Sequence, residues 1–414
     1  MPGPLASSVF CRHQGTGAVS DRRRRGDHPA PAALPPWHDA GTRCTDPYTV
    51  AILSLTTQVC ATQARRRGEA VESSVPGRST SRPVGRTVGD VGERAVLAEL
   101  IGAVDESAAR GAGASDITVV GTGDDAAVFA ASGDTAISTD TIVEGRHFRL
   151  DLSSPREIGA RAVVQSVADV AAMGARITGV VVSIAVPGST DVAVVTEINR
   201  GIAGAARDLG AVVLGGDLVA ASQIVITVTA LGAMDGRAPV LLGGARPGDT
   251  LAVSGPLGAS AAGLAILLSG RPGPRETFPA FVSAFRVPGP DLAQGVVAAR
   301  AGARAMTDIS DGLIEELITL ADKSGVSVAV DSGSVPRPAG LAEAAAALGV
   351  DATDWVLAGG EDHQLLAAFA QPGQVPDGWT VIGEVHPPGH GVVVDGVSAG
   401  AVRGWQSFGP GAQE

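Results

Sequence analysis

Cysteine is scarce in this sequence and is absent from most of its length. The chain has 414 residues and three cysteines, Cys11, Cys44 and Cys60, none of which follows Arg86. Residues 87–414 therefore contain no disulfide, no thiolate zinc site and no cysteine nucleophile. The cysteine-dependent classes of enzyme are excluded for this larger part of the chain.

Lysine and long apolar runs are also nearly missing. The only lysine, Lys323, lies in ADKSG at the end of a helical pattern and not after a glycine-rich turn, which excludes a Walker A phosphate-binding loop. No apolar run approaches the ~18 residues of a membrane-spanning helix. The N-terminus lacks the basic-then-apolar order of a secretory signal. We therefore expect a cytoplasmic protein with no membrane partner.

Positive charge is concentrated at one end of the chain. The formal net charge is −12, but twelve arginines stand against six acidic residues up to Arg86, so residues 87–414 are strongly acidic. An acidic body repels nucleic acid and attracts divalent cations. We expect no nucleic-acid partner for it.

Residues 1–86 combine proline-rich pieces, two arginine clusters and almost no periodic apolar pattern. Such a composition buries too little apolar surface to offset the entropy of ordering, so we predict a disordered extension that the rest of the protein does not need. Binding of the arginine clusters to RNA or to anionic lipid is an open alternative. Another is a later translation start, although no methionine lies between Met1 and Met173.

From Thr87 onward, short β-rich runs alternate with alanine-rich amphipathic segments. A stretch rich in glycine and proline, from Met234 to Asp249, interrupts the alternation, which then resumes. We predict two α/β domains, residues 87–236 and 245–410. In the first, the predicted strands are 116–120, 135–139, 177–186, 211–216 and 223–231, and the predicted helices are 155–175 and 190–210.

Two short motifs match familiar signatures but lack the context that those signatures need. Residues 121–126 fit GxGxxA, yet the acidic pair Asp124 and Asp125 would repel a pyrophosphate, and no helical pattern follows. Ser398 lies in GxSxG, but no Asp or His follows it, so the hydrolase order Ser, Asp, His cannot be completed. We treat both as chance matches in a glycine-rich chain.

Acidic residues recur at the ends of apolar strands, among glycine, serine and threonine. Taken singly, Asp125 and Asp217 fit turns, Asp308 or Ser310 fits a helix N-cap, and Asp169 fits a helix surface. The set resists this explanation because Asp169 falls among apolar residues on a stripe that should be buried. The segments are GTGDDAAVF, ISTDTIVEGRHF, SVADVAAMGA, LGGDL, MTDISDGL and AGGEDH.

Convergence of these carboxylates would require a cation. Two unit charges 4 Å apart repel by about 4 kcal/mol at an effective dielectric constant near 20. Oxygen ligands without histidine or cysteine pairs favour a hard ion, Mg²⁺ before Ca²⁺, often shared with substrate phosphates. Spacing in the sequence does not prove that the carboxylates meet.

Together these segments are typical of one enzyme family. From about Val88 to Phe408 the chain resembles the thiamine-monophosphate kinase family, through GDDAAVF, STDTIVEGRHF, SVADVAAMGA, GGD, SGPLGASAAGLAIL, DISDGL and GGED in family order. The superfamily includes aminoimidazole ribonucleotide synthetase, selenophosphate synthetase and a hydrogenase maturation protein. The resemblance implies a two-domain α/β (α+β) fold: an N-terminal domain whose strands form a dimeric barrel with a second subunit, and a C-terminal α/β domain closing over the nucleotide.

The resemblance also implies roles for individual residues. We expect Asp169 and Asp308 to be the catalytic pair. Positions that contact ATP in the family are occupied here by Gly216, Asp217 and Ser310, and positions that contact thiamine phosphate by His147, Glu361 and Trp405. Magnesium positions are occupied by Asp125, Ser138, Thr139, Asp140, Asp169, Asp217, Asp308 and Asp311.

The implied reaction transfers the γ-phosphoryl group of ATP to thiamine monophosphate, with Mg²⁺ as cofactor. One departure stands out: Leu242 and Gly243 occupy the place of an arginine that faces ATP phosphates in the family, and Arg237 or Arg246 is an alternative donor. Two other functions stay open. One is a binding protein for nucleotide or thiamine phosphate with weakened catalysis, and the other is aminoimidazole ribonucleotide synthetase.

Overall fold

The structure is a computed structural model that describes residues 85–109, 117–122, 126–131, 133–399 and 404. Residues Ser81–Glu414 form one compact unit. The predicted extension, residues 1–86, lies outside the described residues except for Gly85 and Arg86.

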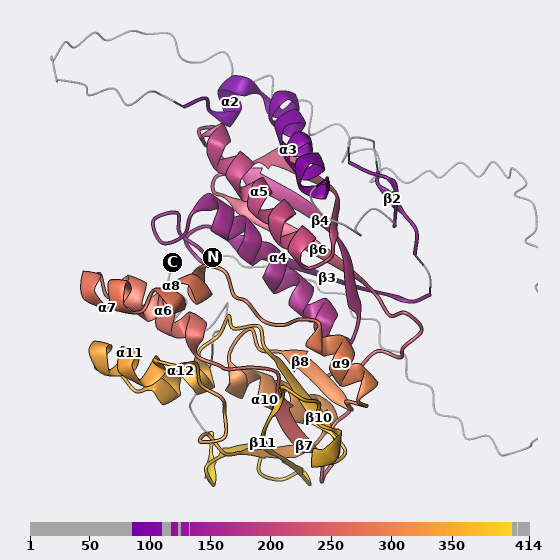
Figure 1. The fold of residues 1–414 in the computed structure, drawn as a ribbon, viewed down its shortest axis with the longest axis vertical. Coiled ribbons are helices and arrows are strands. Elements are labelled where there is room, and N and C mark those ends of the chain that lie inside the picture. Colours follow the sequence, from indigo (N-terminus) through magenta and orange to yellow (C-terminus); the bar gives the residue numbers. More distant parts are fainter. Residues whose placement is uncertain (1–84, 110–116, 123–125, 132, 400–403, 405–414) are drawn as a thin grey trace, which may run out of the picture. The chain divides into compact units, whose positions relative to one another are not determined.

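The first half of the unit is a four-stranded sheet with two long helices packed on one face (Figure 1). Its strand order is β3-β6-β4-β5; β4 and β5 are parallel, and the other neighbours are antiparallel. A separate β1-β2 hairpin precedes it. The elements are α2 (Val88–Val91), α3 (Glu93–Ala108), β1 (Thr118–Val120), β2 (Val128–Phe129), β3 (Thr135–Val143), α4 (Pro155–Ala172), β4 (Arg176–Val186), α5 (Val192–Asp208), β5 (Val212–Ala220) and β6 (Val225–Ala233).

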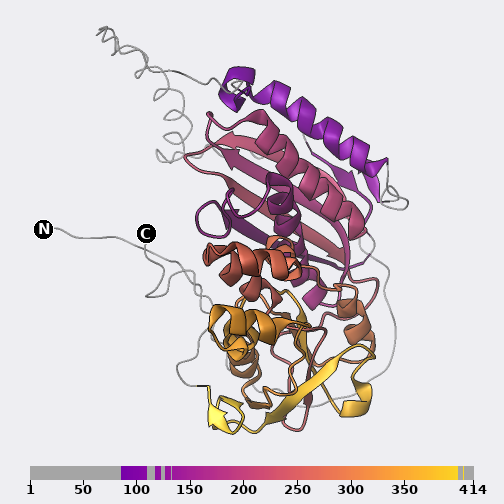
Figure 2. The same cartoon turned by 60° about the vertical axis from the view of Figure 1, so that its left-hand side comes forward.

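The second half is a seven-stranded sheet with helices around it (Figures 1 and 2). Its order is β13-β12-β9-β11-β7-β10-β8, in which only β12 and β9 are parallel. The elements are β7 (Thr250–Val253), α6 (Ala259–Leu268), α7 (Pro272–Thr277), α8 (Pro279–Arg286), α9 (Gln294–Arg300), β8 (Ala305–Asp308), α10 (Leu313–Ser324), β9 (Ser327–Val330), α11 (Leu341–Leu348), α12 (Ala352–Ala358), β10 (Leu365–Phe369), a 3₁₀ turn (Pro372–Gln374), β11 (Thr380–His386), β12 (Val392–Val394) and β13 (Val397–Ser398).

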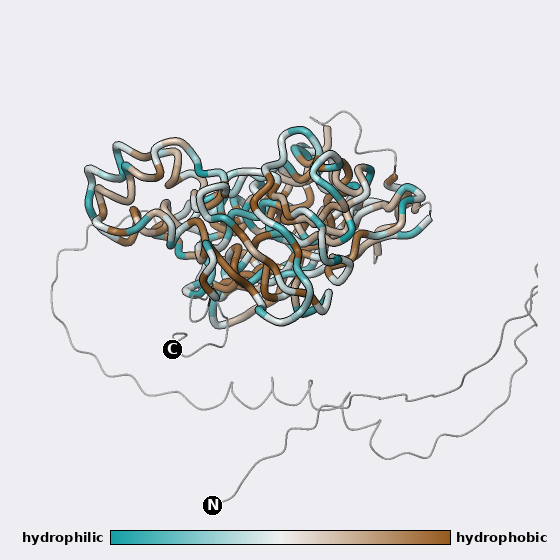
Figure 3. The backbone as a smooth tube through the Cα atoms, turned by 90° about the horizontal axis from the view of Figure 1, so that it is seen from below, coloured by the Kyte–Doolittle hydropathy of each residue, from teal (hydrophilic) through white to brown (hydrophobic). Residues whose placement is uncertain are grey.

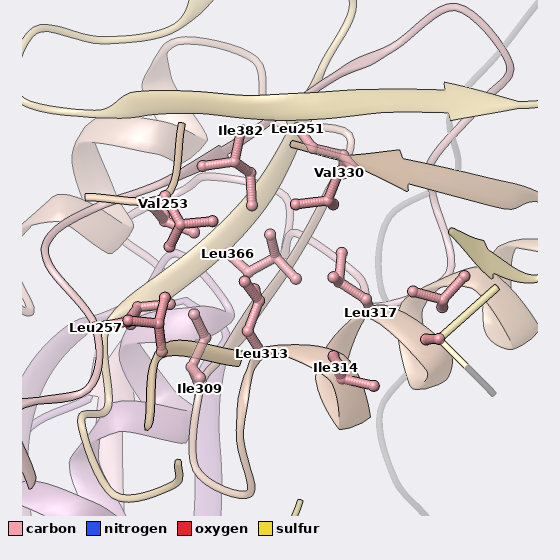
Figure 4. Close-up of a cluster of buried hydrophobic side chains, with 14 of the residues drawn as sticks. Leu251, Val253, Leu257, Ile309, Leu313, Ile314, Leu317, Val330, Leu366 and Ile382 are labelled. Atoms are coloured by element: carbon pink, nitrogen blue, oxygen red, sulfur yellow. The ribbon is translucent and has the colours of Figure 1, made fainter. Parts of the chain in front are cut away.

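Each half has its own apolar core. In the first half, side chains such as Ile158, Ile198 and Ile226 lie fully buried between the sheet and helices α4 and α5. In the second, Leu251, Leu366 and their neighbours fill the space between the sheet and α10 (Figure 4). Full burial of one such side chain stabilises the folded protein by about 1.5–3 kcal/mol. Stretches of hydrophobic residues accordingly run through the interior of the folded part (Figure 3).

The sequence marks the start of α4 clearly. Ser154 accepts a hydrogen bond from the backbone N–H of Glu157, whose carboxylate accepts one in return from the backbone N–H of Ser154. Pro155 occupies the first helical position, where its missing N–H costs nothing. This capping box fixes the register of the helix and therefore the direction in which each of its side chains points.

Two glycines allow α4 and α5 to approach closely. A Cβ atom on Gly159 would lie 2.0 Å from the carbonyl oxygen of Ile198, and one on Gly201 would lie 1.9 Å from that of Arg156. Each helix therefore meets the backbone of the other at a glycine. No larger residue fits there unless the helices separate.

All of the strands and both of the helices predicted for the first half are present, with ends shifted by a few residues. The pattern did not predict α3, α8, α11 or α12. Several of these are short helices, for which tertiary packing outweighs local propensity. Within the described residues, no helix is both long and apolar enough to cross a membrane.

The helix contact gives the first testable prediction. Gly201→Ala should destabilise the protein by about 1–3 kcal/mol, because the added methyl group would overlap the α4 backbone. Gly204→Ala is the matched control on the same helix, since nothing lies within 4 Å of its would-be Cβ. It should be neutral or stabilising by up to ~1 kcal/mol, because alanine favours a helix more than glycine does. Urea unfolding midpoints that were equal for the two variants would contradict the packing argument.

Candidate active site

An acidic cavity of about 240 Å³ lies where the two halves of the unit meet. The first half contributes residues of β3 and α4, and the second contributes the end of β8 and the loops before α10 and β10. The lining residues are Asp140, Thr141, His147, Gln165, Asp169, Asp308, Ser310, Asp311, Glu361 and His363. Five of these ten are carboxylates, and neither arginine nor lysine is among them.

Strand β3 divides its predicted ligands between two faces. Side chains of a strand alternate, so Ser138 and Asp140 share one face and Thr139 lies on the other. Ser138 donates a hydrogen bond to Asp169 across the site, with 2.5 Å between Oγ and Oδ2. Thr139 instead pairs with Thr229, 3.1 Å away on β6. Asp140 thus lines the acidic cavity, Ser138 contacts the lining residue Asp169, and the Thr139 side chain lies on the far side of the sheet.

Helix α4 turns a polar stripe toward the site. Arg161, Gln165 and Asp169 are four residues apart and therefore lie on one face of the helix. The opposite face carries Gly159 and the apolar side chains that pack against α5. Asp169 is thus a residue of the cavity wall, and the alternative that it is an ordinary surface charge is wrong.

The other acidic motif follows β8. Asp308 is the last residue of this strand and is 6% exposed, while Ser310 and Asp311 follow in the turn before α10. That helix is preceded by Gly312 and has no side-chain cap. Neither Asp308 nor Ser310 is therefore an N-cap, and all three side chains line the cavity. Likewise, Asp217 lies within strand β5 and not in a turn.

The loop before β10 has an unusual backbone. Glu361 and His363 have positive φ angles of 68° and 52°, which are costly for residues other than glycine. Buried hydrogen bonds from their backbone N–H groups, to Ser310 and Ile309, maintain this geometry. The intervening Asp362 accepts hydrogen bonds from the backbone N–H groups of Gly258 and Ser260, at 2.5 and 2.9 Å, and so occupies the N-terminus of α6.

His363 lies between two carboxylates of the acidic cavity, those of Asp308 and Glu361. It is 1% exposed, and its Nδ1 lies 3.0 Å from Oδ2 of Asp308. Its Nε2 lies 3.6 Å from Oε2 of Glu361. Burial opposes protonation, but the hydrogen bond with Asp308 and the negative charge of the nearby Glu361 raise the pKa of His363 well above its ordinary value. The imidazolium is therefore a built-in counter-charge between them.

Three carboxyl groups in or beside the cavity have pKa values above their usual range. Burial, and then the charge of Asp308, raise the pKa of Asp169 to about 6. Burial, followed by the charge of Glu361, raises that of Asp311 to about 6, and burial raises that of Glu316, behind Ser310, to about 7. Excess negative charge is thus unfavourable in this cavity until a cation enters.

The donor set fits magnesium better than a softer ion. Among the described residues, no group of three or more His, Cys, Asp or Glu side chains is arranged so that it could hold a metal ion by itself. Mg²⁺ commonly uses only one or two carboxylates and completes its octahedron with water and substrate phosphate. Asp140, Asp169, Asp308 and Asp311 offer such oxygen ligands in one cavity.

A second cavity, of about 630 Å³, adjoins the acidic one and shares His147 and Glu361 with it. Its wall is mainly apolar and includes Leu264, Leu268 and Phe285. Gly404 also lines it, but Trp405, the predicted substrate residue beside Gly404, lies outside the described residues.

The other predicted site residues lie elsewhere. Gly216 and Asp217 line a separate cavity of about 700 Å³ beside the open face of the four-stranded sheet. Asp125 lies outside the described residues. Leu242 packs against the core of the second half. Neither alternative arginine lines the acidic cavity: Arg237 lies 3.5 Å from Asp235, and Arg246 is exposed.

Comparison with known proteins agrees with this architecture. Residues 123–234 match the model for the N-terminal domain of AIR synthase related proteins, and residues 246–396 match the model for the C-terminal domain. The thiamine-monophosphate kinase of Mycobacterium tuberculosis is 43% identical over 325 residues, which cover 78% of this chain and 93% of that protein. The chain belongs to the thiamine-monophosphate kinase family.

Other members of the thiamine-monophosphate kinase family are also similar to this chain. The enzyme of Corynebacterium glutamicum is 42% identical over 332 residues, covering 78% of this chain and 96% of that protein. Among solved structures, AaThiL complexed with AMPPCP and TMP has a TM-score of 0.62 and 28% identity, over 80% of this chain and all of that one. The kinase from Stenotrophomonas maltophilia K279a has a TM-score of 0.63 and 28% identity, over 73% and 97%.

The sequence did not indicate several residues that line the two cavities, among them Arg161, Gln165 and His363. The first two carried a detectable signal, since polar residues at 161, 165 and 169 interrupt an apolar helix at four-residue intervals. His363 carried none, because its proximity to Asp308 depends on β8 and β10 being neighbours.

Without bound metal, the stability of the protein should fall as the pH rises from about 4 to 7. The folded-state pKa values of Asp169, Asp311 and Glu316 lie above the unfolded values near 4. The folded protein therefore binds more protons in this window, and the stability that those protons contribute is lost as they leave. Asp169→Asn removes one such group and should raise stability at pH 8 by roughly 2 kcal/mol.

Calorimetric melting in EDTA at pH 5 and pH 8 would measure this effect. Asp377→Asn, at an exposed aspartate that does not line the cavity, is the control and should not change the pH dependence. A melting temperature of Asp169→Asn that is no higher than wild type at pH 8 would contradict the proposed repulsion.

Proposed function

We propose that this protein is an ATP-dependent kinase that phosphorylates thiamine monophosphate to thiamine diphosphate with Mg²⁺. One observation carries the proposal: carboxylates from both halves meet in one acidic cavity, and a larger, mainly apolar cavity adjoins it. Membership of the thiamine-monophosphate kinase family supports the reaction, and the AaThiL complex with AMPPCP and TMP supports the substrate pair.

The two adjoining cavities suit the two ends of the acceptor. The thiamine rings are largely apolar and carry a positive charge, so the 630 Å³ cavity with the Glu361 carboxylate at its edge suits them. The phosphate of the acceptor would reach into the acidic cavity past His147 and Glu361, which line both cavities. We propose Trp405 as a further contact of the rings.

The reaction needs positioning more than proton transfer. An oxygen of the acceptor phosphate forms a bond to the γ-phosphorus of ATP, and the bond from that phosphorus to the β–γ bridging oxygen breaks to release ADP. Because the attacking phosphate is already ionised near neutral pH, no strong base is needed. Bound Mg²⁺ would neutralise charge on the phosphates as the group transfers.

The chain's own residues would hold the reacting groups in line. We assign metal binding to Ser138, Asp140, Asp169, Asp308 and Asp311 around the acidic cavity, with Asp125 as a further ligand and Thr139 through its backbone oxygen. Asp169 and Asp308, from opposite halves, would be the essential pair. We assign Ser310 to the ATP phosphates and Gly216 and Asp217 to the nucleotide in the neighbouring cavity.

The proposed kinase predicts a specific loss of activity. Asp169→Asn and Asp308→Asn should each lower kcat by at least about 100-fold at millimolar Mg²⁺, because asparagine keeps the side-chain volume but removes a metal-binding charge. Asp377→Asn should retain wild-type turnover. Formation of thiamine diphosphate and ADP, followed by chromatography, measures the effect.

Each outcome of this assay has a clear meaning. Wild-type protein that makes no thiamine diphosphate, while a related kinase works in parallel, would overturn the proposed function. Binding of both substrates without turnover would instead support the weakened-catalysis alternative. Full activity of both asparagine variants would show that these aspartates are structural.

We also propose that the protein acts as a homodimer, built on the open face of the four-stranded sheet. Helices α4 and α5 cover one face, whereas Ile137, Val181 and Val219 on the other face are 68%, 40% and 44% exposed. A monomer rarely exposes so many large apolar side chains together. A second copy of this sheet would cover them and close the cavity that contains Gly216 and Asp217.

A charged residue on this face should separate the subunits. Ile137→Glu should convert the dimer to a monomer at micromolar concentration, because two copies would bury the added carboxylates without partners. Val350→Glu alters an exposed valine that lies outside this sheet and should leave the dimer intact. Sedimentation velocity distinguishes these results, and a wild-type monomer would overturn the dimer proposal.

The predicted division of the chain is part of the same proposal. We assign nucleotide and metal binding and dimerisation to residues 87–236, and closure over the substrates to residues 245–410, with residues 1–86 dispensable. Because the reaction consumes ATP, we place the protein in the cytoplasm.

A further inference from the structure

We propose that Arg161 is a positioning residue that holds the Glu361 carboxylate in place for the acceptor substrate. The inference rests on the proposed function, in which Glu361 contacts thiamine monophosphate. It adds a residue that the sequence motifs did not indicate and that belongs to the other half of the protein.

Arg161 is a buried cation with a fixed geometry. Its side chain is 3% exposed on the inner face of α4, where an unpaired charge would be strongly unfavourable. One guanidinium nitrogen lies 2.6 Å from Oε2 of Glu361, and another donates a hydrogen bond to the backbone oxygen of Phe285, at 3.1 Å. The guanidinium also stacks 4.9 Å from the centroid of the Phe285 ring. Together these contacts fix the orientation of the guanidinium group.

The Glu361 side chain, in contrast, contacts Arg161 on one side and faces the cavities on the other. Its side chain is 28% exposed and lines both the acidic cavity and the apolar cavity. Its positive φ angle fixes the direction of the Cβ bond but not the later torsions of the side chain. Arg161, 2.6 Å from the carboxylate, is therefore its nearest charged partner at the junction of the two cavities, while His363 lies 3.6 Å away.

Charge gives the contact a second effect. Burial alone would raise the pKa of Glu361, but Arg161 first, and then His363, lower it to about 2. Without Arg161, the carboxylate would face Asp308 and Asp311 with only His363 as a counter-charge. It would then turn away from the acidic cavity or take up a proton. In either case the cavity would lose an oriented anion at the place proposed for the substrate.

The ion pair also joins the two halves of the site. Arg161 lies on α4, two helical turns from Asp169, whereas Glu361 lies in the loop that precedes β10. An ion pair that only stabilised the contact between the halves would matter equally for both substrates. A positioning residue would instead affect the acceptor substrate much more than ATP, and this difference allows a test.

The experiment compares four variants of the full chain: Arg161→Lys, Arg161→Met, Glu361→Gln and the double variant Arg161→Met/Glu361→Gln. For each, the KM for thiamine monophosphate, the KM for ATP and kcat are measured. Binding of thiamine monophosphate without ATP is measured by calorimetry. Arg156→Met is the matched control: Arg156 is exposed on the same helix and pairs with Glu197, away from both cavities.

We expect Arg161→Met to raise the KM and the Kd for thiamine monophosphate by about tenfold or more, as expected for a lost charged hydrogen bond, with the KM for ATP changed less than about twofold. Arg161→Lys should restore part of the loss, since it keeps the charge but not the planar fork. The double variant should bind no worse than Glu361→Gln, because the two residues act as one unit.

Two results would overturn the inference. One is a lower melting temperature in Arg161→Met with an unchanged KM for thiamine monophosphate, and the other is additive losses in the double variant. If Arg161→Met does not fold, Arg161→Lys and the double variant, which leaves no unpaired buried charge, decide the matter. Failure of the proposed function is distinct, because wild-type protein would then show no turnover of thiamine monophosphate.

Discussion

Repulsion between carboxylates is the constraint on which this site depends. Asp140 and Asp169 come from the first half of the unit, and Asp308, Asp311 and Glu361 from the second, yet all five line one cavity of about 240 Å³. Such an arrangement persists only if the surrounding fold maintains it and if positive charge compensates for part of it. The protein supplies two buried counter-charges of its own, His363 and Arg161, both beside Glu361. The remaining negative charge is left for a bound cation and the substrate to compensate.

Helix α4 connects packing to chemistry. Gly159 and Arg161 are separated by about 200° around the helix axis, so they lie on opposite faces. The glycine face meets the backbone of α5, which fixes the helix against its own sheet. The polar face presents Arg161, Gln165 and Asp169 to the other half of the protein. The close helix contact therefore sets the position of the site residues, since any separation of α4 from α5 would move all three.

The local motifs of the site could be predicted from the sequence, but contacts between residues far apart in the chain could not. The SVADVAAMGA, DISDGL and GGED segments marked Asp169, Asp308 and Glu361 because acidic residues among apolar neighbours need an explanation even in one sequence. Ser138 and Thr139 were indistinguishable as neighbours, and the alternation of β3 separates their side chains. Gly216 and Asp217 were grouped with the acidic residues, yet they line a different cavity. His363 carried no signal because its partner Asp308 lies in another strand, whereas the four-residue spacing of Arg161, Gln165 and Asp169 was a signal that was not used.

The sequence predicted most of the strands and helices from Thr87 onward, the break near residues 234–249 and the acidic motifs that mark the family, but not α3, α8, α11 or α12. Local patterns encode these features, because apolar periodicity and capping act over a few residues. Which of these motifs meet depends on how the strands pair and the helices pack. The pairing of β8 with β10 brings Asp308 to His363, and the packing of α4 between the halves brings Asp169 and Arg161 to the same place. Contacts of this kind depend on sheet order and helix packing between residues that lie 55 positions apart or more, and no local pattern records them.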